Sequence, residues 1–325
     1  MIVEISIGNY LSFKDTVTIS LVASNVKEHK ETHIFQEKKL NLLKSAILYG
    51  ANASGKTNLI SALSFIRSFV LNSATNYQAD EEISVNPFKL NTSTETMPSY
   101  FEIVFIQNQI RYRYGFETTQ EKVISEWLFY VPKSREVELF NRQGNHYSIK
   151  NSFKEGKGLE SKTRENALFL SVVAQFNGEI SNDIIEWFKN LYAINGVNNG
   201  RLSSTKKWLK DDERKKKIID FIKLADLSID DLTLKPIDLD DQNLPEDIPN
   251  EIRDFIAKMD SDVLFSSHKK YDKNNNFVTY EPFHVDSTES EGTIKIISLA
   301  VPIIDALQKG KVLFIDELDA KLHPL

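Results

Sequence analysis

The sequence predicts an α/β protein with a mixed core sheet, an antiparallel β-subdomain and a helical insertion. Three observations support this prediction. A glycine-bounded loop at residues 50–57 separates an apolar run from an amphipathic stretch. Apolar and polar residues then alternate between residues 100 and 149, with short polar turns, which is typical of antiparallel strands. Helix-patterned stretches follow in residues 165–258, before strand character returns near residue 263.

The composition is that of an ordinary globular protein. The 325 residues are 41% hydrophobic and 26% charged, and the formal net charge of −6 excludes a chain that wraps nucleic acid through overall basicity. With no cysteine, disulfides, thiol catalysis and cysteine-ligated zinc are excluded. The six histidines show no metal-ligand spacing. The longest apolar stretch, near 296–304, is far below the ~20 residues of a membrane span. The N-terminus is strand-like and lacks a basic start, so we expect a cytoplasmic protein without a signal peptide.

The first 70 residues indicate strands that surround the loop. We expect strands at 3–7 and 16–21, a polar loop over 24–44, a strand at 46–49 and a helix over 58–66. Further strands are expected at 100–105, 110–116, 124–131, 263–265 and 277–280, and a strand pair over 138–149. Helices are expected at 165–176, 181–192, 211–224 and 249–258.

Two details of the insertion complete this interpretation. Ser181 is predicted to cap the second of these helices. The acidic stretch 238–254 is interpreted as a solvated surface, with a partner or metal site as the alternative. The predicted division is residues 1–134 for the first half of the core with the antiparallel sheet, 135–262 for a mainly helical insertion, and 263–325 for the second half of the core.

The loop has the pattern of a phosphate-binding site. Gly50 and Gly55 permit backbone conformations that turn successive N–H groups to one concave side. The helix that follows adds unpaired N–H groups and its positive dipole end. Lys56 is expected to reach the β- and γ-phosphates, and Thr57 to ligate Mg²⁺. The predicted nucleotide-binding residues are Gly50, Ala51, Asn52, Ala53, Ser54, Gly55, Lys56, Thr57 and Asn58.

A second cluster of functional residues follows about 260 residues later in the chain. The apolar strand 311–315 ends in Asp316 and Glu317. A buried strand places Asp316 where it can hold the hydration shell of Mg²⁺, and Glu317 one residue further on is the candidate base for the attacking water. A compact nucleotide-binding fold would place the metal-binding strand much earlier. We therefore expect a large insertion that splits the core.

A helix start precedes this strand. Ser290 and Gly292 stand before the helical stretch 294–300, so a hydroxyl and bare N–H groups are available to a γ-phosphate. Because the loop 50–57 already has many donors, we interpret this helix start as acting on the nucleotide of another subunit. The alternative is an ordinary helix cap.

Together these motifs resemble an ABC-type P-loop ATPase head of the SMC/RecF/OLD-like class. The likeness is greatest to the prokaryotic AAA ATPases of abortive-infection and other anti-phage systems. It spans essentially the whole chain, and it includes the opening 5–13, the loop with its flanks at 49–58, the segment 290–293 and the segment 316–324. Residues 225–229 and 268–271 are also similar.

The resemblance implies roles for these positions. Residues 50–57 would be Walker A, Asp316 and Glu317 Walker B with its catalytic glutamate, and Ser290 with Gly292 the signature motif that caps ATP across a dimer. Residues 319–323 would be the D-loop, with His323 where many relatives have aspartate. Gln107 or Gln109 is the candidate for the Q-loop. Glu289, Glu291 and Thr293 depart from the usual Leu-Ser-Gly-Gly-Gln pattern.

The implied cofactors are ATP and Mg²⁺. The implied partners are a second copy of the chain in a head-to-head dimer or a higher oligomer, and a nuclease or toxin effector. Relatives continue past the D-loop with further strands and a histidine that contacts the γ-phosphate, so the resemblance predicts a head truncated after Leu325 or completed by another polypeptide.

Three other functions are open. The first is a DNA-repair or chromosome-maintenance ATPase, for which the basic stretches 206–210 and 214–217 are the candidate DNA contacts. The short, interrupted helices of the insertion argue against the long coiled coil of that class. The second is a nucleotide-dependent scaffold without turnover. The third is a transporter subunit, which the split core argues against.

Overall fold

The computed structural model describes residues 1–26, 28–76, 78, 80–195, 202–225, 228–236 and 262–320. The chain forms two compact units: unit 1 comprises residues 1–194 and 310–316, and unit 2 comprises 195–309 and 317–325. This division differs from the expected boundaries at 134 and 262. The predicted helix 249–258, the acidic stretch 238–254 and His323 lie outside the described residues.

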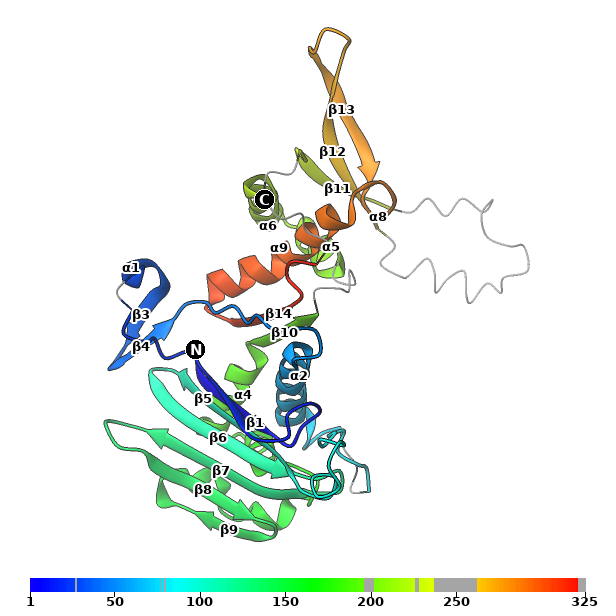
Figure 1. Cartoon of the computed structure of the whole chain (residues 1–325). Coiled ribbons are helices and arrows are strands. Elements are labelled where there is room, and N and C mark those ends of the chain that lie inside the picture. Colours follow the sequence, from blue (N-terminus) through cyan, green and yellow to red (C-terminus); the bar gives the residue numbers. More distant parts are fainter. Residues whose placement is uncertain are drawn as a thin grey trace, which may run out of the picture. The chain divides into compact units, whose positions relative to one another are not determined.

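Unit 1 is built on a seven-stranded sheet of order β2-β1-β5-β6-β7-β8-β9 (Figure 1). Every neighbouring pair is antiparallel, which confirms the strands predicted at 3–7, 16–21, 100–105, 110–116 and 124–131 and the pair over 138–149. The turn between β5 and β6 is tight because Asn108 and Gln109 both have positive φ, 49° and 60°. The strands are β1 (Ile2–Gly8), β2 (Val17–Ser20), β5 (Ser99–Gln107), β6 (Ile110–Thr118), β7 (Val123–Val131), β8 (Val137–Gln143) and β9 (His146–Ile149).

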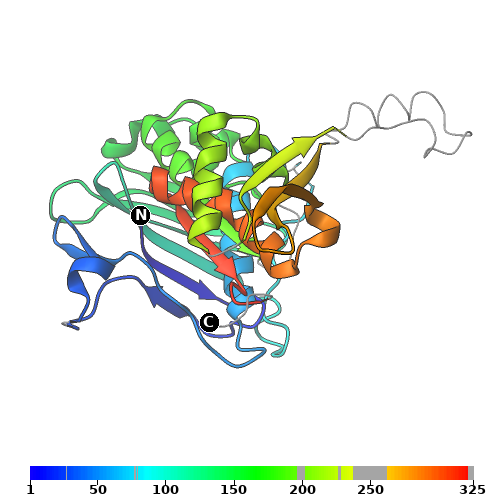
Figure 2. The ribbon, with the colours of Figure 1, turned by 90° about the horizontal axis from the view of Figure 1, so that it is seen from above.

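Helix α2 (Lys56–Asn72) packs its apolar face into the core of this unit (Figures 1 and 2). The buried residues of α2 recur at helical spacing, and aromatic rings of the helix pack against those of the sheet. The centroid of Phe65 lies 5.1 Å from that of Phe101, and that of Phe69 lies 5.5 Å from that of Phe116. Each such buried side chain contributes about 1.5–3 kcal/mol to folding. The buried residues of α2 are Leu59, Ala62, Leu63, Ile66, Phe69 and Val70.

The other helices of unit 1 differ in detail from the prediction. They are two 3₁₀ turns (Asn151–Gly156 and Glu160–Lys162), α3 (Phe169–Gln175) and α4 (Glu179–Lys189). Ser181 does not cap α4, because the cap residue is Gly178 and Ser181 lies inside the helix. The Ser181 hydroxyl instead donates to the Glu155 carboxylate at 2.7 Å.

Two predictions for residues 24–49 are wrong. Most of the expected polar loop is folded as α1 (Lys30–His33) and a hairpin of β3 (Ile34–Glu37) and β4 (Leu40–Leu43). Leu42 from this hairpin is fully buried in a small cluster with Val3 and Ile106. No strand forms over 45–50, where Ile47 and Tyr49 are 75% and 89% exposed. A strand needs a neighbour for its backbone hydrogen bonds, and no strand in the described part of the chain pairs with residues 45–50.

That strand, β14 (Val312–Asp316), pairs with β10 (Leu191–Asn195) and packs against α2. The Val312 N–H donates to the Asn190 carbonyl at 3.1 Å. Residues 312–315 are half-buried, whereas the sequence predicted a buried strand. Asp316 at the strand end is the buried residue, at 7% exposure.

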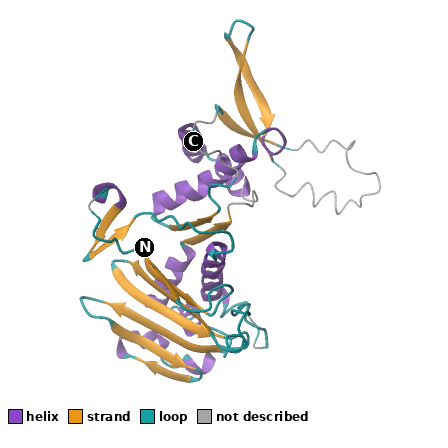
Figure 3. Cartoon of the chain, in the orientation of Figure 1, coloured by secondary structure: helices purple, strands orange, loops and turns teal. Residues whose placement is uncertain are grey.

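Unit 2 combines helices with a three-stranded antiparallel sheet of order β11-β12-β13 (Figure 3). Its core joins apolar residues of α5, α6 and α9 to those of β11 and β12. The sequence did not predict α5 or β11. The elements are α5 (Leu202–Leu209), α6 (Asp212–Leu224), β11 (Asp231–Lys235), β12 (Val263–Tyr271), β13 (Phe277–His284), α8 (Val285–Thr288) and α9 (Glu291–Lys309).

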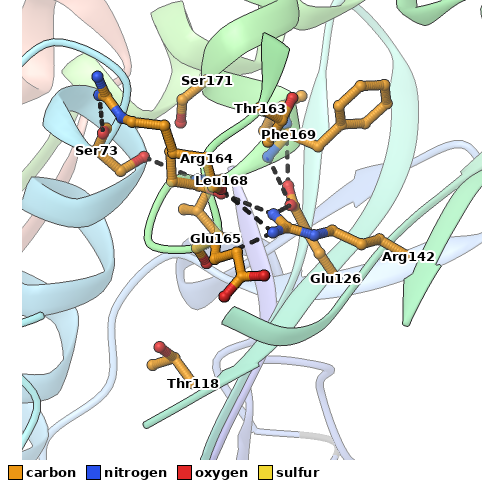
Figure 4. A network of polar contacts seen from close by, with 12 residues as sticks. Ser73, Thr118, Glu126, Arg142, Thr163, Arg164, Glu165, Leu168, Phe169 and Ser171 are labelled. Atoms are coloured by element: carbon orange, nitrogen blue, oxygen red, sulfur yellow. Dashed lines mark hydrogen bonds and ion pairs between the residues drawn. The ribbon is translucent and has the colours of Figure 1, made fainter. Parts of the chain in front are cut away.

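A buried ion pair ties α3 to the sheet of unit 1 (Figure 4). The carboxylate of Glu126 on β7 accepts from the N–H groups of Phe169 and Leu170 at 2.6 and 3.0 Å, and from the Tyr114 hydroxyl at 3.0 Å. Its Oε2 lies 3.6 Å from Nη1 of Arg142 on β8. Burial raises the pKa of Glu126, and Arg142 and the three donors oppose that shift. The carboxylate thus caps the start of α3.

Replacing Glu126 with alanine is expected to destabilise the protein by about 3–5 kcal/mol, because Arg142 stays buried without its carboxylate partner. Urea unfolding followed by circular dichroism measures this. Glu121→Ala, at an exposed position in the β6–β7 turn, is the matched control and should change stability by less than about 0.5 kcal/mol. Equal free energies of unfolding for the two variants would contradict the role of Glu126 as the buried carboxylate partner of Arg142.

Candidate functional site

The backbone of the loop 50–57 accounts for its second glycine. Gly55 has φ of 94° and caps α2, which begins at Lys56. A Cβ at Gly55 would lie 2.8 Å from Oγ of Ser12, so a side chain here would be strained by both its backbone and its neighbour. Ala53 also has positive φ, 64°. The loop therefore has two residues in the left-handed backbone region just before the helix.

Lys56 is the first residue of α2 and contacts the loop through its side chain. Its Nζ donates to the carbonyls of Gly50 and Ala51 at 2.7 and 3.0 Å. Residues 50–54 are exposed, and the first turn of α2 offers N–H groups outside its own ladder together with the positive end of the helix dipole. An ammonium, backbone N–H groups and the exposed Thr57 hydroxyl form a donor set that fits a polyphosphate with its metal ion.

Ser12 is a neighbour of the loop 50–57, and its sequence context predicted no role for it individually. Its Oγ accepts from Nδ2 of Asn58 at 2.8 Å. The turn that carries it is closed by paired hydrogen bonds between Tyr10 and Phe13, and Leu11 there has φ of 48°. The only available signal was the resemblance of residues 5–13 to a family motif, because 46 residues separate Ser12 from Asn58.

The two predicted carboxylates belong to different units. Asp316 ends β14 in unit 1, and this strand packs against α2, the helix that carries Thr57. Unit 1 therefore contains both the loop and the predicted metal ligand. Glu317, the next residue, belongs to unit 2, is exposed and has φ of 47°.

Ser290 caps helix α9. Its Oγ accepts from the N–H of Thr293 at 3.1 Å, and its carbonyl accepts from the N–H of Ile294 at 3.0 Å. Ser290 therefore acts at least as an ordinary helix cap, which was the alternative interpretation of this residue. Gly292 lies in the first turn of α9, where a helix has N–H groups outside its own hydrogen-bond ladder.

Glu289, which departs from the usual signature pattern, is held by two side chains of β12. His268 Nε2 lies 2.7 Å from Oε1 of Glu289, and the Ser266 hydroxyl donates to the same oxygen. These contacts fix the residue immediately before Ser290. An open hollow of about 540 Å³ borders this contact, lined by His268, Lys269, Lys270, Glu281, Phe283, Thr288 and Glu289.

The remaining predicted residues either lie at a hairpin tip or have partners within the chain. Gln107 and Gln109, the Q-loop candidates, lie at the tip of the β5–β6 hairpin. In the basic stretches 206–210 and 214–217, several cations have partners. Lys210 pairs with Asp262 at 2.9 Å, Lys215 with Asp231 at 2.9 Å and Lys217 with Glu213 at 2.6 Å, and Arg214 lies over the Trp208 ring.

A glycine-bounded loop around a lysine at a helix start, in one unit with a strand that ends in a buried carboxylate, defines a P-loop nucleotide-binding protein. A family model described as "AAA domain, putative AbiEii toxin, Type IV TA system" matches residues 45–325. The chain belongs to this family of AAA-type P-loop ATPases. No curated protein sequence matches the chain. Within the described part of the chain, no helix has both the length and the apolar character needed to cross a membrane.

Proposed function

We propose that this chain binds ATP with Mg²⁺ at the loop 50–57 and hydrolyses it. The observation that carries the proposal is the position of Lys56, whose Nζ lies 2.7 and 3.0 Å from carbonyl oxygens of the loop at the positive end of α2. An ammonium group beside exposed backbone N–H groups at a helix start is a favourable site for an anion such as a polyphosphate.

Each residue has a role in this proposal. Lys56 binds the β- and γ-phosphate oxygens, and the backbone N–H groups of residues 51–56 bind the remaining oxygens. Thr57 and Asp316 hold the metal ion, and Glu317 accepts the proton of the attacking water. Bound Mg²⁺·ATP supplies the phosphoanhydride bond, with the metal ion neutralising part of the charge that develops as this bond breaks.

We further propose that two copies act as a dimer. Ser290 and Gly292 of one copy would then bind the γ-phosphate held by the loop of the other copy. The support is the resemblance to ABC-type heads and the position of both residues at the start of α9. In such a dimer the γ-phosphate favours assembly, and hydrolysis releases it.

The biological role that best fits this switch is the control of an effector in anti-phage defence inside the cell. The family description names an AbiEii toxin and a type IV toxin–antitoxin system, which supports a toxin–antitoxin context. The nuclease or toxin partner itself is implied by the resemblance of the ATPase motifs. The DNA-repair alternative receives less support, because Lys210, Lys215 and Lys217 of its candidate contact surface are paired with carboxylates.

Replacing Lys56 with alanine should weaken ATP binding by about 10- to 100-fold, because a hydrogen bond to a charged group is worth about 1.5–3 kcal/mol. Isothermal titration calorimetry with a non-hydrolysable ATP analogue measures the affinity. Lys133→Ala, at an exposed position between β7 and β8, controls for the loss of a positive charge from unit 1. Unchanged affinity in Lys56→Ala would overturn the nucleotide site.

Replacing Glu317 with glutamine should lower kcat by about 100-fold or more, since a general base contributes at least that factor, while ATP binding persists. The ATP-bound dimer should accumulate and be visible by light scattering after size-exclusion chromatography. Glu121→Gln provides the isosteric control on an exposed turn. Normal turnover by Glu317→Gln would remove this residue from the mechanism, and a monomer in saturating ATP would remove the dimer.

A further inference from the structure

A buried lysine follows the start of α9. Lys295 is 1% exposed, and its Nζ donates to the backbone carbonyls of Glu317 and Ala320, at 2.6 Å each. Removing an ammonium group from water is costly unless strong acceptors replace the lost hydration. A lysine at this position is therefore explained by what it holds, which is the segment 317–320.

That segment is a tight turn with an unusual backbone. The Ala320 N–H donates to the Glu317 carbonyl at 3.1 Å, so this carbonyl accepts from both Ala320 and Lys295. Glu317 itself has φ of 47°, in the left-handed region that non-glycine residues rarely adopt. Such a conformation persists only where its surroundings determine it. Lys295 is one of the groups that determine it here.

We propose that Lys295 is a positioning residue for Glu317, an inference that rests on the proposed function. By holding the Glu317 carbonyl, Lys295 fixes the direction in which the Glu317 side chain leaves the backbone. The same helix carries Ser290 at its cap and Lys295 in its second turn. The predicted γ-phosphate contact and the predicted base are thereby joined through one rigid element within unit 2.

The chemistry of lysine fits this role. An ammonium has three donors and no acceptor, so one side chain can satisfy two carbonyls at once. Methionine has a similar length without the donors, and arginine keeps both the charge and the donors. Methionine therefore removes the hydrogen bonds of Lys295 at a similar volume, whereas arginine keeps the donors at a larger volume.

The test compares ATP turnover by the full chain with Lys295→Met, Lys295→Arg and Ser298→Ala. Ser298 is buried on the same helix, and its hydroxyl donates to the Lys295 carbonyl at 2.7 Å, so it controls for loss of a polar group from α9. We expect Lys295→Met to lower kcat by about 100-fold, the effect of a misplaced catalytic group, with KM for ATP unchanged. Lys295→Arg should have a higher kcat than Lys295→Met because it keeps donors for the two carbonyls, and Ser298→Ala should keep the wild-type kcat.

Hydrogen exchange provides a readout that needs no activity. The amide of Ala320 should exchange faster in Lys295→Met than in wild type, while the amides of α2 keep their rates. If Lys295→Met does not fold, Lys295→Gln, which keeps an amide donor on a shorter chain, is the second variant, and it should show a lower kcat together with faster exchange at Ala320.

The outcomes separate this inference from the proposed function. Wild-type kcat in Lys295→Met, alongside an inactive Glu317→Gln, would overturn the inference and preserve the proposed function. Normal turnover in Glu317→Gln would count against the proposed catalytic role itself. Unchanged exchange at Ala320 would overturn the inference whatever the activity, because the turn would then not depend on Lys295.

Discussion

The packing of α2 against the antiparallel sheet of unit 1 is the interaction on which the candidate site depends. Contacts between Phe65 or Phe69 and aromatic rings of β5 and β6 fix the helix, and the helix start fixes Lys56. Because β14 packs against the same helix, α2 also brings the predicted metal ligand Asp316 into the same compact unit as the loop. A shift of α2 would therefore displace Lys56 and the N–H groups that are predicted to bind phosphate, so the proposed function depends on this contact in the core.

A second constraint concerns the carboxylates at the end of β14. The boundary between the units falls between Asp316 and Glu317, so the predicted metal ligand belongs to the unit with the loop and the predicted base to the unit with α9. Lys295 ties the base to α9. In the proposed mechanism, different elements therefore hold the two carboxylates: β14 carries Asp316, and the hydrogen bond from Lys295 holds the backbone of Glu317.

Local patterns predicted much of this structure, and contacts distant in the sequence were the main source of error. The loop 50–57 and α2 follow from glycine spacing and helical periodicity, which act within a few residues. The strand predicted at 46–49 is absent because strand formation depends on a partner, and no strand in the described part of the chain pairs with this segment. Lys295 gave no signal, since its acceptors are backbone carbonyls 22 and 25 residues away and any residue type supplies a carbonyl.

The central claim is that the loop 50–57 and Asp316 together form a Mg²⁺-dependent ATP site. Calorimetric titration of a non-hydrolysable ATP analogue, with Mg²⁺ and with chelator, tests it in wild type and in Asp316→Asn. Mg²⁺ should tighten binding to wild type by about tenfold or more, as expected for one additional charge-assisted contact, and should tighten binding to Asp316→Asn clearly less, because Thr57 alone then remains of the two metal-binding side chains. An equal response to Mg²⁺ in both proteins would contradict the claim.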